Sequence, residues 1–337
     1  MGYMRVGGDR GTLFPKDRCI VSFDGTHIAY TMRGSGDGPV VVLCAGYVCP
    51  DNFWTYLAPE LEARSRVLIW NYRGAGVSGM PREPGFWSRG VGVADFAIEN
   101  YAKDLKAILD HEGIDRIALV GHSMGVQVCF EAYRLMPERV TALVSISGPF
   151  ASPVRTFYNF AMFPKVFAAA RVGINAFPRP THVVWRRFFK TGIPHALARR
   201  IGAVGPKCKA EDMATYYEHM AELDPLIMMK MAEAMHRHSA EDLLRHIQVP
   251  ALVIVGDRDN FTPPWLGRVM ASRIPVAEQL VVEGGTHAAI IEEPRIINDA
   301  VIDFLARHTG TGKRVRLIPE TDSVAGPSRA RTGRSRR

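Results

Sequence analysis

One short stretch, residues 116–127, constrains the fold of this chain more than any other part of it. It reads Arg-Ile-Ala-Leu-Val-Gly-His-Ser-Met-Gly-Val-Gln. The apolar run 117–120 predicts a strand buried on both faces, and apolar residues recur at helical spacing after the motif. Between strand and helix, Gly121, Ser123 and Gly125 form a G-x-S-x-G pattern. A sharp turn at such a junction holds the serine clear of the backbone, so the pattern predicts a nucleophile.

Strand-like and helix-like segments alternate along most of the chain, which predicts the α/β class with a mostly parallel sheet covered on both faces. The first two strands are joined by Asp24-Gly25, which is a hairpin signal. The predicted strands are residues 19–23, 27–33, 40–44, 66–70, 117–120, 140–146, 250–255 and 279–282. The predicted helices are residues 51–63, 95–111, 126–137, 263–274 and 294–308.

The alternation stops after residue 149. The segment 153–245 shows no strand pattern, is rich in aromatic residues and methionines, and predicts helices broken near Pro178, Pro194 and Pro206. Because strands resume afterwards, an insertion into one sheet explains this order better than two independent domains. The predicted domains are a core in residues 1–152 and 246–309, a helical cap in residues 153–245 and a tail in residues 310–337.

The net charge of +8 comes largely from the C-terminus. The stretch 313–337 holds eight Lys and Arg against two acidic residues, so the rest of the chain carries only +2. The high pI therefore describes a tail and predicts no specific nucleic-acid partner for the folded part. With almost no apolar residues, the tail is expected to be disordered. A solvated terminus without a role is favoured over a weak contact with anionic partners.

The chain has no run of 18 uncharged apolar residues, so we expect no membrane span. Its N-terminus lacks the apolar core of a signal peptide, and Val6 stands where myristoylation needs Ser or Thr. The five cysteines are odd in number, have no metal-ligand spacing and lie mostly in apolar segments. Packing is favoured over a disulfide between Cys44 and Cys49. Reduced thiols and a cytoplasmic location are expected.

An activated serine needs a base within hydrogen-bonding reach and a carboxylate behind that base. In open α/β folds, sites lie at the carboxyl ends of the strands. His287 fits the base, because it follows the predicted strand 279–282 through a flexible Glu-Gly-Gly-Thr turn. The acid should follow the preceding strand, where the chain carries Asp257 and Asp259. The resulting chain order is serine, acid, histidine, the order expected for a serine elbow of this kind.

With these motifs in place, residues 18–308 resemble the α/β-hydrolase fold serine hydrolases, esterase-like or lipase-like with a helical cap. The resemblance implies an α/β-hydrolase fold, with a mostly parallel eight-stranded sheet flanked by helices. In that family the acid commonly sits three residues after the glycine that ends the strand, which selects Asp259 over Asp257. The implied catalytic triad is therefore Ser123, Asp259 and His287.

The resemblance also implies an oxyanion hole made of backbone amides. The family's loop after the third strand often reads His-Gly-x, whereas this chain has Ala-Gly-Tyr ending at Tyr47. The usual histidine is missing, which keeps a non-catalytic homologue open as an alternative, but the Tyr47 amide can still donate beside that of Met124 at the start of a helix. Residues 73–78 resemble the family's R-G-x-G-x-S turn, with Asn71 where aspartate is frequent. We interpret that turn as structural.

Serine rather than aspartate at the elbow separates this chain from the related dehalogenases and epoxide hydrolases, which form an alkyl ester on aspartate. A serine implies an acyl-enzyme on Ser123, so the leading hypothesis is a carboxylic-ester hydrolase that needs no cofactor or metal. The aromatic and methionine residues left over from the cap's own core favour a small to medium apolar or aromatic substrate. Alternatives are a C–C bond hydrolase, a lactonase or a thioesterase, or a non-catalytic ligand-binding homologue. Both a monomer and a homodimer are compatible with the sequence.

Other histidines have simpler interpretations than catalysis. His122 precedes the elbow serine and is expected to be packed and structural. His236, Arg237 and His238 suggest a metal site at first sight, but no carboxylate or cysteine stands at ligand spacing. A solvated helix face is the favoured interpretation.

Overall fold

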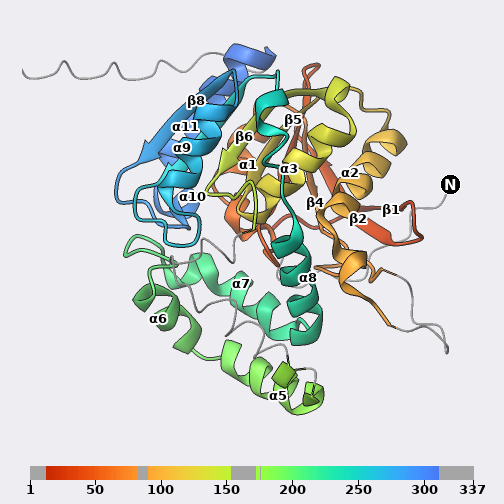
Figure 1. The fold of residues 1–337 in the computed structure, drawn as a ribbon, viewed down its shortest axis with the longest axis vertical. Helices are drawn as coiled ribbons and strands as arrows, with labels where there is room; N and C mark the ends of the chain where they lie inside the picture. The colour runs from red at the N-terminus through yellow and green to blue at the C-terminus, as the bar shows by residue number, and fades with distance from the viewer. Residues whose placement is uncertain (1–12, 82–89, 153–171, 175, 311–337) are drawn as a thin grey trace, which may run out of the picture.

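The computed structural model describes residues 13–81, 90–152, 172–174 and 176–310. Eight strands form one sheet in the order β1-β2-β4-β3-β5-β6-β7-β8 (Figure 1). Only β2 runs antiparallel to its neighbours, β1 and β4, and every other pair is parallel. The predicted fold class is therefore confirmed. The strands are β1 (Arg18–Val21), β2 (His27–Arg33), β3 (Val40–Cys44), β4 (Val67–Trp70), β5 (Ile117–His122), β6 (Val140–Ile146), β7 (Ala251–Gly256) and β8 (Ala277–Val282).

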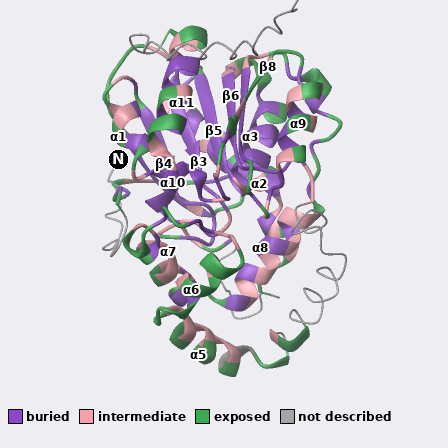
Figure 2. Cartoon of the chain, turned by 90° about the vertical axis from the view of Figure 1, so that its left-hand side faces the viewer, coloured by how far each residue is buried: buried purple, intermediate pink, exposed green. Residues whose placement is uncertain are grey.

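Helices cover both faces of the sheet, and the middle strands show why. In β3 every residue is buried, with alternate side chains entering two separate cores. Val40 and Val42 pack on the side of α2, α3 and α9, whereas Val41 and Leu43 pack on the side of α1, α10 and α11. Figure 2 shows the central strands as a buried layer. The helices of these two layers are α1 (Leu57–Glu62), α2 (Ile98–Glu112), α3 (Met124–Leu135), α9 (Pro264–Arg273), α10 (Ala289–Glu292) and α11 (Pro294–Thr309).

Two predicted helices are divided in the structure. The predicted helix 51–63 is a 3₁₀ turn, η1 (Asp51–Trp54), followed by α1. An uninterrupted helix would need a backbone N–H at Pro59 to hydrogen-bond to the preceding turn. Proline has none, so the segment is divided into η1 and α1. The predicted helix 95–111 begins as a second 3₁₀ turn, η2 (Val93–Phe96), and Ala97 adopts an extended conformation before α2. Two short 3₁₀ turns elsewhere are η3 (Pro137–Arg139) and η6 (Leu244–His246).

Between β6 and β7, the described part of the chain includes the helices α5 (Pro178–Phe189), α6 (Ile193–Arg200), α7 (Ala210–Glu222) and α8 (Pro225–Arg237). Figures 1 and 2 place them together at one end of the molecule, away from the helices that flank the sheet. Pro178 and Pro194 lie in the first turns of α5 and α6, where proline is tolerated, and Pro206 lies between α6 and α7. The helix breaks therefore occur where the prolines predicted them.

The predicted domain boundaries stay predictions. The first part of the predicted cap, residues 153–171, and the predicted tail beyond Gly310 lie outside the described residues. Among the helices that the structure does describe, none combines the length and the apolar composition needed to cross a membrane.

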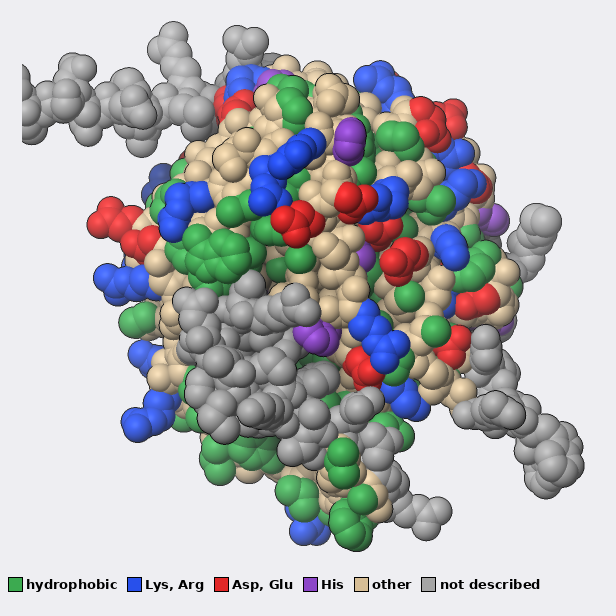
Figure 3. Space-filling model, viewed as in Figure 1, with side chains coloured by type: hydrophobic (Ala, Val, Ile, Leu, Met, Phe, Trp, Pro, Cys, Tyr) green, Lys and Arg blue, Asp and Glu red, His purple; other side chains and the backbone are tan. Residues whose placement is uncertain are grey.

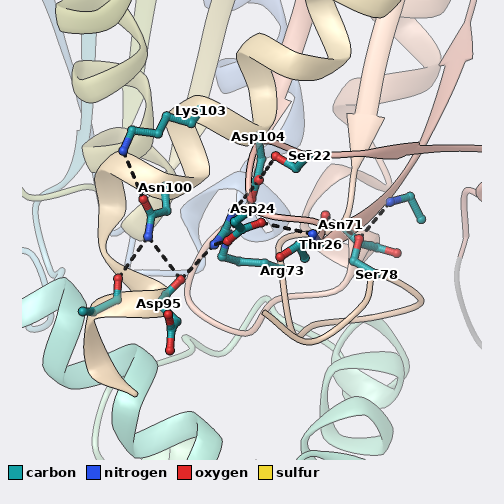
Figure 4. Close-up of polar contacts among 12 residues, drawn as sticks. Ser22, Asp24, Thr26, Asn71, Arg73, Ser78, Asp95, Asn100, Lys103 and Asp104 are labelled. Carbon is teal, nitrogen blue, oxygen red and sulfur yellow. Dashed lines mark hydrogen bonds and ion pairs between the residues drawn. The ribbon is translucent and has the colours of Figure 1, made fainter. Parts of the chain in front are cut away.

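Arg73, in the R-G-x-G-x-S turn, is completely buried and joins three parts of the core (Figure 4). Its guanidinium donates to both carboxylate oxygens of Asp104 on α2, at 2.7 and 2.6 Å. It also donates to the carboxylate of Asp24, in the hairpin between β1 and β2, at 2.7 Å. Burial raises the pKa of the Asp104 carboxyl, and the hydrogen bonds and charge of Arg73 oppose that rise. These contacts agree with the structural interpretation of the turn.

The buried ion pair yields a first prediction. Replacing Arg73 by Met leaves Asp104 buried without a cation, so the free energy of unfolding should fall by about 3–5 kcal/mol. Urea-induced unfolding followed by circular dichroism measures this change. The double variant Arg73→Met with Asp104→Leu should recover much of the loss, because no buried charge remains. If the single variant unfolds at the wild-type urea concentration, the ion pair does not hold the turn.

Candidate active site

The turn between β5 and α3 has the strained geometry expected of a serine elbow. Ser123 adopts φ 53° and ψ −122°, a conformation that L-residues rarely adopt and that costs about 1–3 kcal/mol. Glycine at the flanks lets the chain close this turn. A Cβ atom at Gly125 would lie 1.9 Å from the carbonyl oxygen of Cys44 in β3, and one at Gly121 would lie 2.6 Å from the carbonyl oxygen of Gly125. The elbow therefore fits only if both positions lack a side chain.

The structure brings the three predicted triad residues together. His287 lies between the other two, with Nε2 at 2.9 Å from Ser123 Oγ and Nδ1 at 2.9 Å from Asp259 Oδ2. A carboxylate can only accept, so Nδ1 must carry the ring hydrogen. Nε2 then has a free lone pair and accepts the hydroxyl proton of Ser123. This is the tautomer that a general base requires.

Asp259 is completely enclosed and well provided with donors. Its Oδ1 accepts the amides of Phe261 and Thr262 at 2.8 and 2.9 Å, and its Oδ2 accepts the Thr262 hydroxyl at 2.7 Å. Burial alone raises the pKa of Asp259, but the charge of His287 and the hydrogen bonds from His287 and Thr262 outweigh it, and the net pKa is lowered. Asp259 therefore stays ionised behind the imidazole. Asp257, the other candidate acid, is exposed.

The predicted oxyanion loop lies against the elbow. A Cβ atom at Gly46 would stand 3.2 Å from the Cβ of Ser123. Among the described residues, neither the Tyr47 amide nor the Met124 amide has a hydrogen-bond acceptor. The loop is held from outside, because the Tyr47 hydroxyl donates to the carbonyl of Met228 on α8 at 2.6 Å. Both amides are thus available to a ligand beside Ser123.

A cavity of about 490 Å³ opens above Ser123 and His287. The sheet side supplies the reacting side chains, and the helices α5 to α8 supply much of the remaining wall. Among the described lining residues there is no Asp, Glu, Lys or Arg. The sequence did not identify these wall residues one by one, although the aromatic and methionine content of the insertion was the signal. Representative wall residues are Trp185, Phe188, Phe189, Met213, Met220 and Met228.

His122 is packed beside the site. Its ring stacks on Phe53 with 4.6 Å between the ring centroids, and its Nε2 lies 3.2 Å from the backbone carbonyl of His287. Since a carbonyl only accepts, Nε2 carries the hydrogen and the ring is neutral. Burial, reinforced by the charge of His287, lowers the pKa of His122 to about 3. His122 thus supports the backbone of the catalytic-histidine candidate.

The remaining candidates of the sequence are accounted for by ordinary contacts. His238 is buried, and its Nε2 lies 2.9 Å from the Glu131 carboxylate, so it is not on a solvated face as expected. The backbone turns inward after α8 ends, which buries that ring. His236 contacts Ser152. Within the described part of the chain, no three His, Cys, Asp or Glu side chains group as metal ligands. All five cysteines are free, so Cys44 and Cys49 form no disulfide.

The comparison with protein families agrees with this geometry. The family described as alpha/beta hydrolase fold matches residues 39–294, well over half of the chain. The chain belongs to the α/β-hydrolase fold family. The fold and the hydrolase class expected from the sequence are thereby confirmed.

Individual members of this family are distant relatives. Bifunctional epoxide hydrolase 2 of Mus musculus is 26% identical over 299 residues, which are 80% of this chain and 52% of that protein. The chain thus spans about half the length of that relative. A thermophilic esterase from Thermogutta terrifontis has a TM-score of 0.64 at 24% identity, covering 86% of this chain and 98% of the other. The enol-lactonase from Burkholderia xenovorans LB400 has a TM-score of 0.63 at 23% identity, covering 86% and 99%. These two structures show the fold alone.

Glu292 is a site residue that the sequence did not reveal. Its buried carboxylate accepts the Thr286 amide at 3.1 Å and the Thr286 hydroxyl at 2.7 Å, directly before His287. It also accepts the amide of Gly205, in the connection between α6 and α7. One carboxylate therefore ties the histidine loop to the inserted helices. No local sequence pattern around Glu292 predicts its contact with Gly205, which is far away in the chain.

The low pKa of His122 makes a prediction about acid stability. The unfolded chain takes up this proton below the ordinary pKa of about 6.5, whereas the folded protein takes it up only near pH 3. Lowering the pH through that window therefore favours unfolding. In His122→Gln, which keeps a donor for the His287 carbonyl, the loss of stability between pH 7 and pH 4.5 should be smaller by about 2–3 kcal/mol. Urea unfolding at both pH values measures it, and parallel losses in the two proteins would refute it.

Glu292 and its neighbour allow a matched comparison. In Glu292→Gln the amide nitrogen replaces an acceptor and faces a buried donor, so the free energy of unfolding should fall by about 1–3 kcal/mol. The control is Glu293→Gln, whose carboxylate pairs, among the described residues, with the exposed Lys207; this change should alter stability by less than about 1 kcal/mol. Urea unfolding of the two variants decides the matter. Equal effects would mean that the Glu292 contacts add nothing beyond a surface ion pair.

Proposed function

We propose that this protein is a serine hydrolase that cleaves carboxylic esters of small to medium size, apolar or aromatic, through an acyl-enzyme on Ser123. The observation that carries the proposal is the hydrogen-bonded series Ser123, His287, Asp259, with 2.9 Å at each contact, opening into an apolar cavity. Nucleophile, base and orienting acid are each within reach of the next, as covalent catalysis by serine requires.

The proposed reaction has two halves. Ser123 Oγ attacks the ester carbonyl while His287 Nε2 takes its proton, and the amides of Tyr47 and Met124 donate to the oxygen that becomes negative. His287 then gives the proton to the departing alcohol oxygen, and the acyl group remains on Ser123. In the second half, water loses a proton to His287 and attacks the acyl-enzyme; the bond to Ser123 Oγ then breaks, Oγ takes the proton back from His287, and the acid is released. Asp259 stabilises the imidazolium in both halves.

The identity of the nucleophile favours acyl chemistry over epoxide opening. The epoxide hydrolases of this family use aspartate at the elbow, and this chain has Ser123. Two of the similar structures belong to an esterase and an enol-lactonase, both acyl-transfer enzymes, and this supports the proposal by analogy. Lactones, thioesters and C–C bonds beside a carbonyl are cleaved through the same kind of acyl-enzyme. Esters, thioesters and lactones suit this chemistry better than amides, because an amine is a poorer leaving group than an alcohol or a thiol.

The cavity limits the substrate. An ionised group on the substrate would lose its water without gaining a charged partner, since no acidic or basic chain lines the described wall. Methionine side chains adapt to varied apolar shapes, and several of them face this cavity. The substrate should therefore be uncharged over the part that enters. The cytoplasmic location inferred from the sequence stays a prediction.

Covalent labelling tests the nucleophile. A fluorophosphonate probe should label the wild type, with the adduct on Ser123 by peptide mass spectrometry, and should not label Ser123→Ala. In Asp259→Asn the imidazole loses its preferred tautomer, so turnover of a p-nitrophenyl ester should fall by about 10³–10⁴-fold. Asp257→Asn is the matched control and should keep wild-type turnover. A folded wild-type protein that resists the probe would contradict the proposal.

A substrate panel separates the alternatives. Neutral aryl and alkyl esters should be turned over, and the same esters carrying a carboxylate on the acyl chain should be poor substrates. Labelling without turnover of any ester, but with cleavage of lactones, thioesters or C–C bonds, would replace the ester assignment. Tight ligand binding without any product would indicate a non-catalytic homologue.

A further inference from the structure

Helix α6 carries an apolar stripe that faces outward. Ile193, Leu197 and Ile201, the residue just after the helix, follow one another at intervals of four, so they share one face. Their exposed fractions are 57%, 46% and 39%, which is unusual for three large apolar side chains in succession. A stripe of this kind is unfavourable in water unless something covers it.

The same stripe borders the entrance of the active-site cavity. Leu197 and Ile201 line the cavity and are also exposed, and no other lining residue in the described part of the chain is in the exposed class. Their side chains therefore stand where the cavity meets the outside. Whatever covers the α6 stripe also covers the route by which substrate reaches Ser123.

Helices α5 and α6 carry arginines and no acidic residue, whereas the neighbouring α7 carries the exposed Glu211, Glu218 and Glu222. The stretch 139–210 contains twelve Lys and Arg and no Asp or Glu. On α5 and α6, Arg187, Arg199 and Arg200 are exposed, and none of them pairs with a carboxylate of the described chain. Arg186 is also on this face but is partly neutralised by Glu222 of α7. The exposed surface of α5 and α6 is thus both apolar and cationic.

Helix α5 extends this surface to the end of the molecule. Val183 and Val184 are 54% and 68% exposed, and the inner neighbours Trp185 and Phe188 form the cavity wall. Figure 3 shows hydrophobic side chains with Lys or Arg beside them at the lower end, where Figure 1 places α5. We call α5 and α6 with these exposed side chains the cap face.

We propose that the cap face docks on an anionic phospholipid bilayer and that apolar substrate enters the cavity from the lipid; this entry step rests on the proposed function. Interfacial helices combine apolar side chains that enter the lipid boundary with Lys or Arg that meet anionic headgroups. Both components are present here and surround the entrance. An apolar ester dissolves in the bilayer, so a cavity entrance that contacts the lipid meets a high local concentration of substrate.

Other occupants fit less well. A second copy in a two-fold interface would set this face against itself and bring like-charged arginines of the two copies together. A nucleic acid would match the arginines, but its phosphate backbone offers nothing to the exposed valines, leucine and isoleucines. A bilayer satisfies both the apolar and the cationic groups at once.

Vesicle flotation tests the docking. The full-length wild type should float with vesicles of phosphatidylcholine containing phosphatidylglycerol and remain at the bottom with phosphatidylcholine alone. Arg199→Gln with Arg200→Gln should weaken binding about tenfold, because each basic residue near the surface contributes to adsorption. The matched control, Arg268→Gln with Arg295→Gln, removes the same charge from exposed positions on α9 and α11 and should bind as the wild type does. Ile193→Ser, which does not line the cavity, should also weaken binding.

Each other outcome counts against the proposal. If both double variants lose binding equally, the protein binds the vesicles through its net charge or its basic C-terminal segment and not through the cap face. If the protein sediments as a dimer that Ile193→Ser dissociates, while flotation is unchanged, the face is an interface between copies. Ser123→Ala should float like the wild type, so docking is judged independently of hydrolysis.

A second measurement tests entry from the lipid. Arg199→Gln with Arg200→Gln should hydrolyse a water-soluble ester at the wild-type rate but a vesicle-borne ester about tenfold more slowly. Equal rates on the vesicle-borne ester would overturn entry from the bilayer. Absence of turnover on both esters, with flotation intact, would overturn the proposed function and leave the docking in place.

Discussion

The active site depends on one close approach between backbones. Where β5 turns into α3, the carbonyl oxygen of Cys44 occupies the space that any side chain at Gly125 would need. The absence of a side chain at Gly125 lets α3 lie close against β3, next to the strained Ser123 and the loop at Gly46. The strain is tolerable because the surrounding strands are fully buried and cannot relax. Without this approach, the serine would be an ordinary residue at a helix start.

Chemistry and recognition come from different parts of the molecule. The edge of the sheet carries Ser123, Asp259 and His287, held by short loops on rigid strands. The inserted helices contribute an apolar wall beside these residues, and two of the contacts between the layers involve loops next to the triad. Tyr47 joins the oxyanion loop to α8, and Glu292 joins the histidine loop to the α6–α7 connection. Movement of the inserted helices would therefore shift both the Tyr47 loop and the His287 loop.

Local patterns predicted most of the framework because they reflect local physics. The central strands β3, β4 and β7 are continuous apolar runs, which is typical of parallel strands buried on both faces. The prolines at 178 and 194 began helices, as their fixed φ requires. The pattern was misleading at residues 51–63, where apolar spacing suggested one helix and the missing amide of Pro59 divided it. His238 was expected in solvent and is buried against Glu131, since helix periodicity does not describe the residue after the helix ends.

The sequence by itself determined the class of fold, the serine elbow and the order of the three polar residues that meet there. Each of these rests on residue types whose chemistry or backbone freedom has few substitutes, such as glycine at a tight turn. Only the tertiary structure decided that Glu292 reaches Gly205, that the described residues of the cavity wall include no Asp, Glu, Lys or Arg, and that Leu197 and Ile201 line the cavity while staying exposed. Those features are contacts and exposures between segments far apart in the chain. No spacing along the sequence encodes them, because they exist only once the layers are packed.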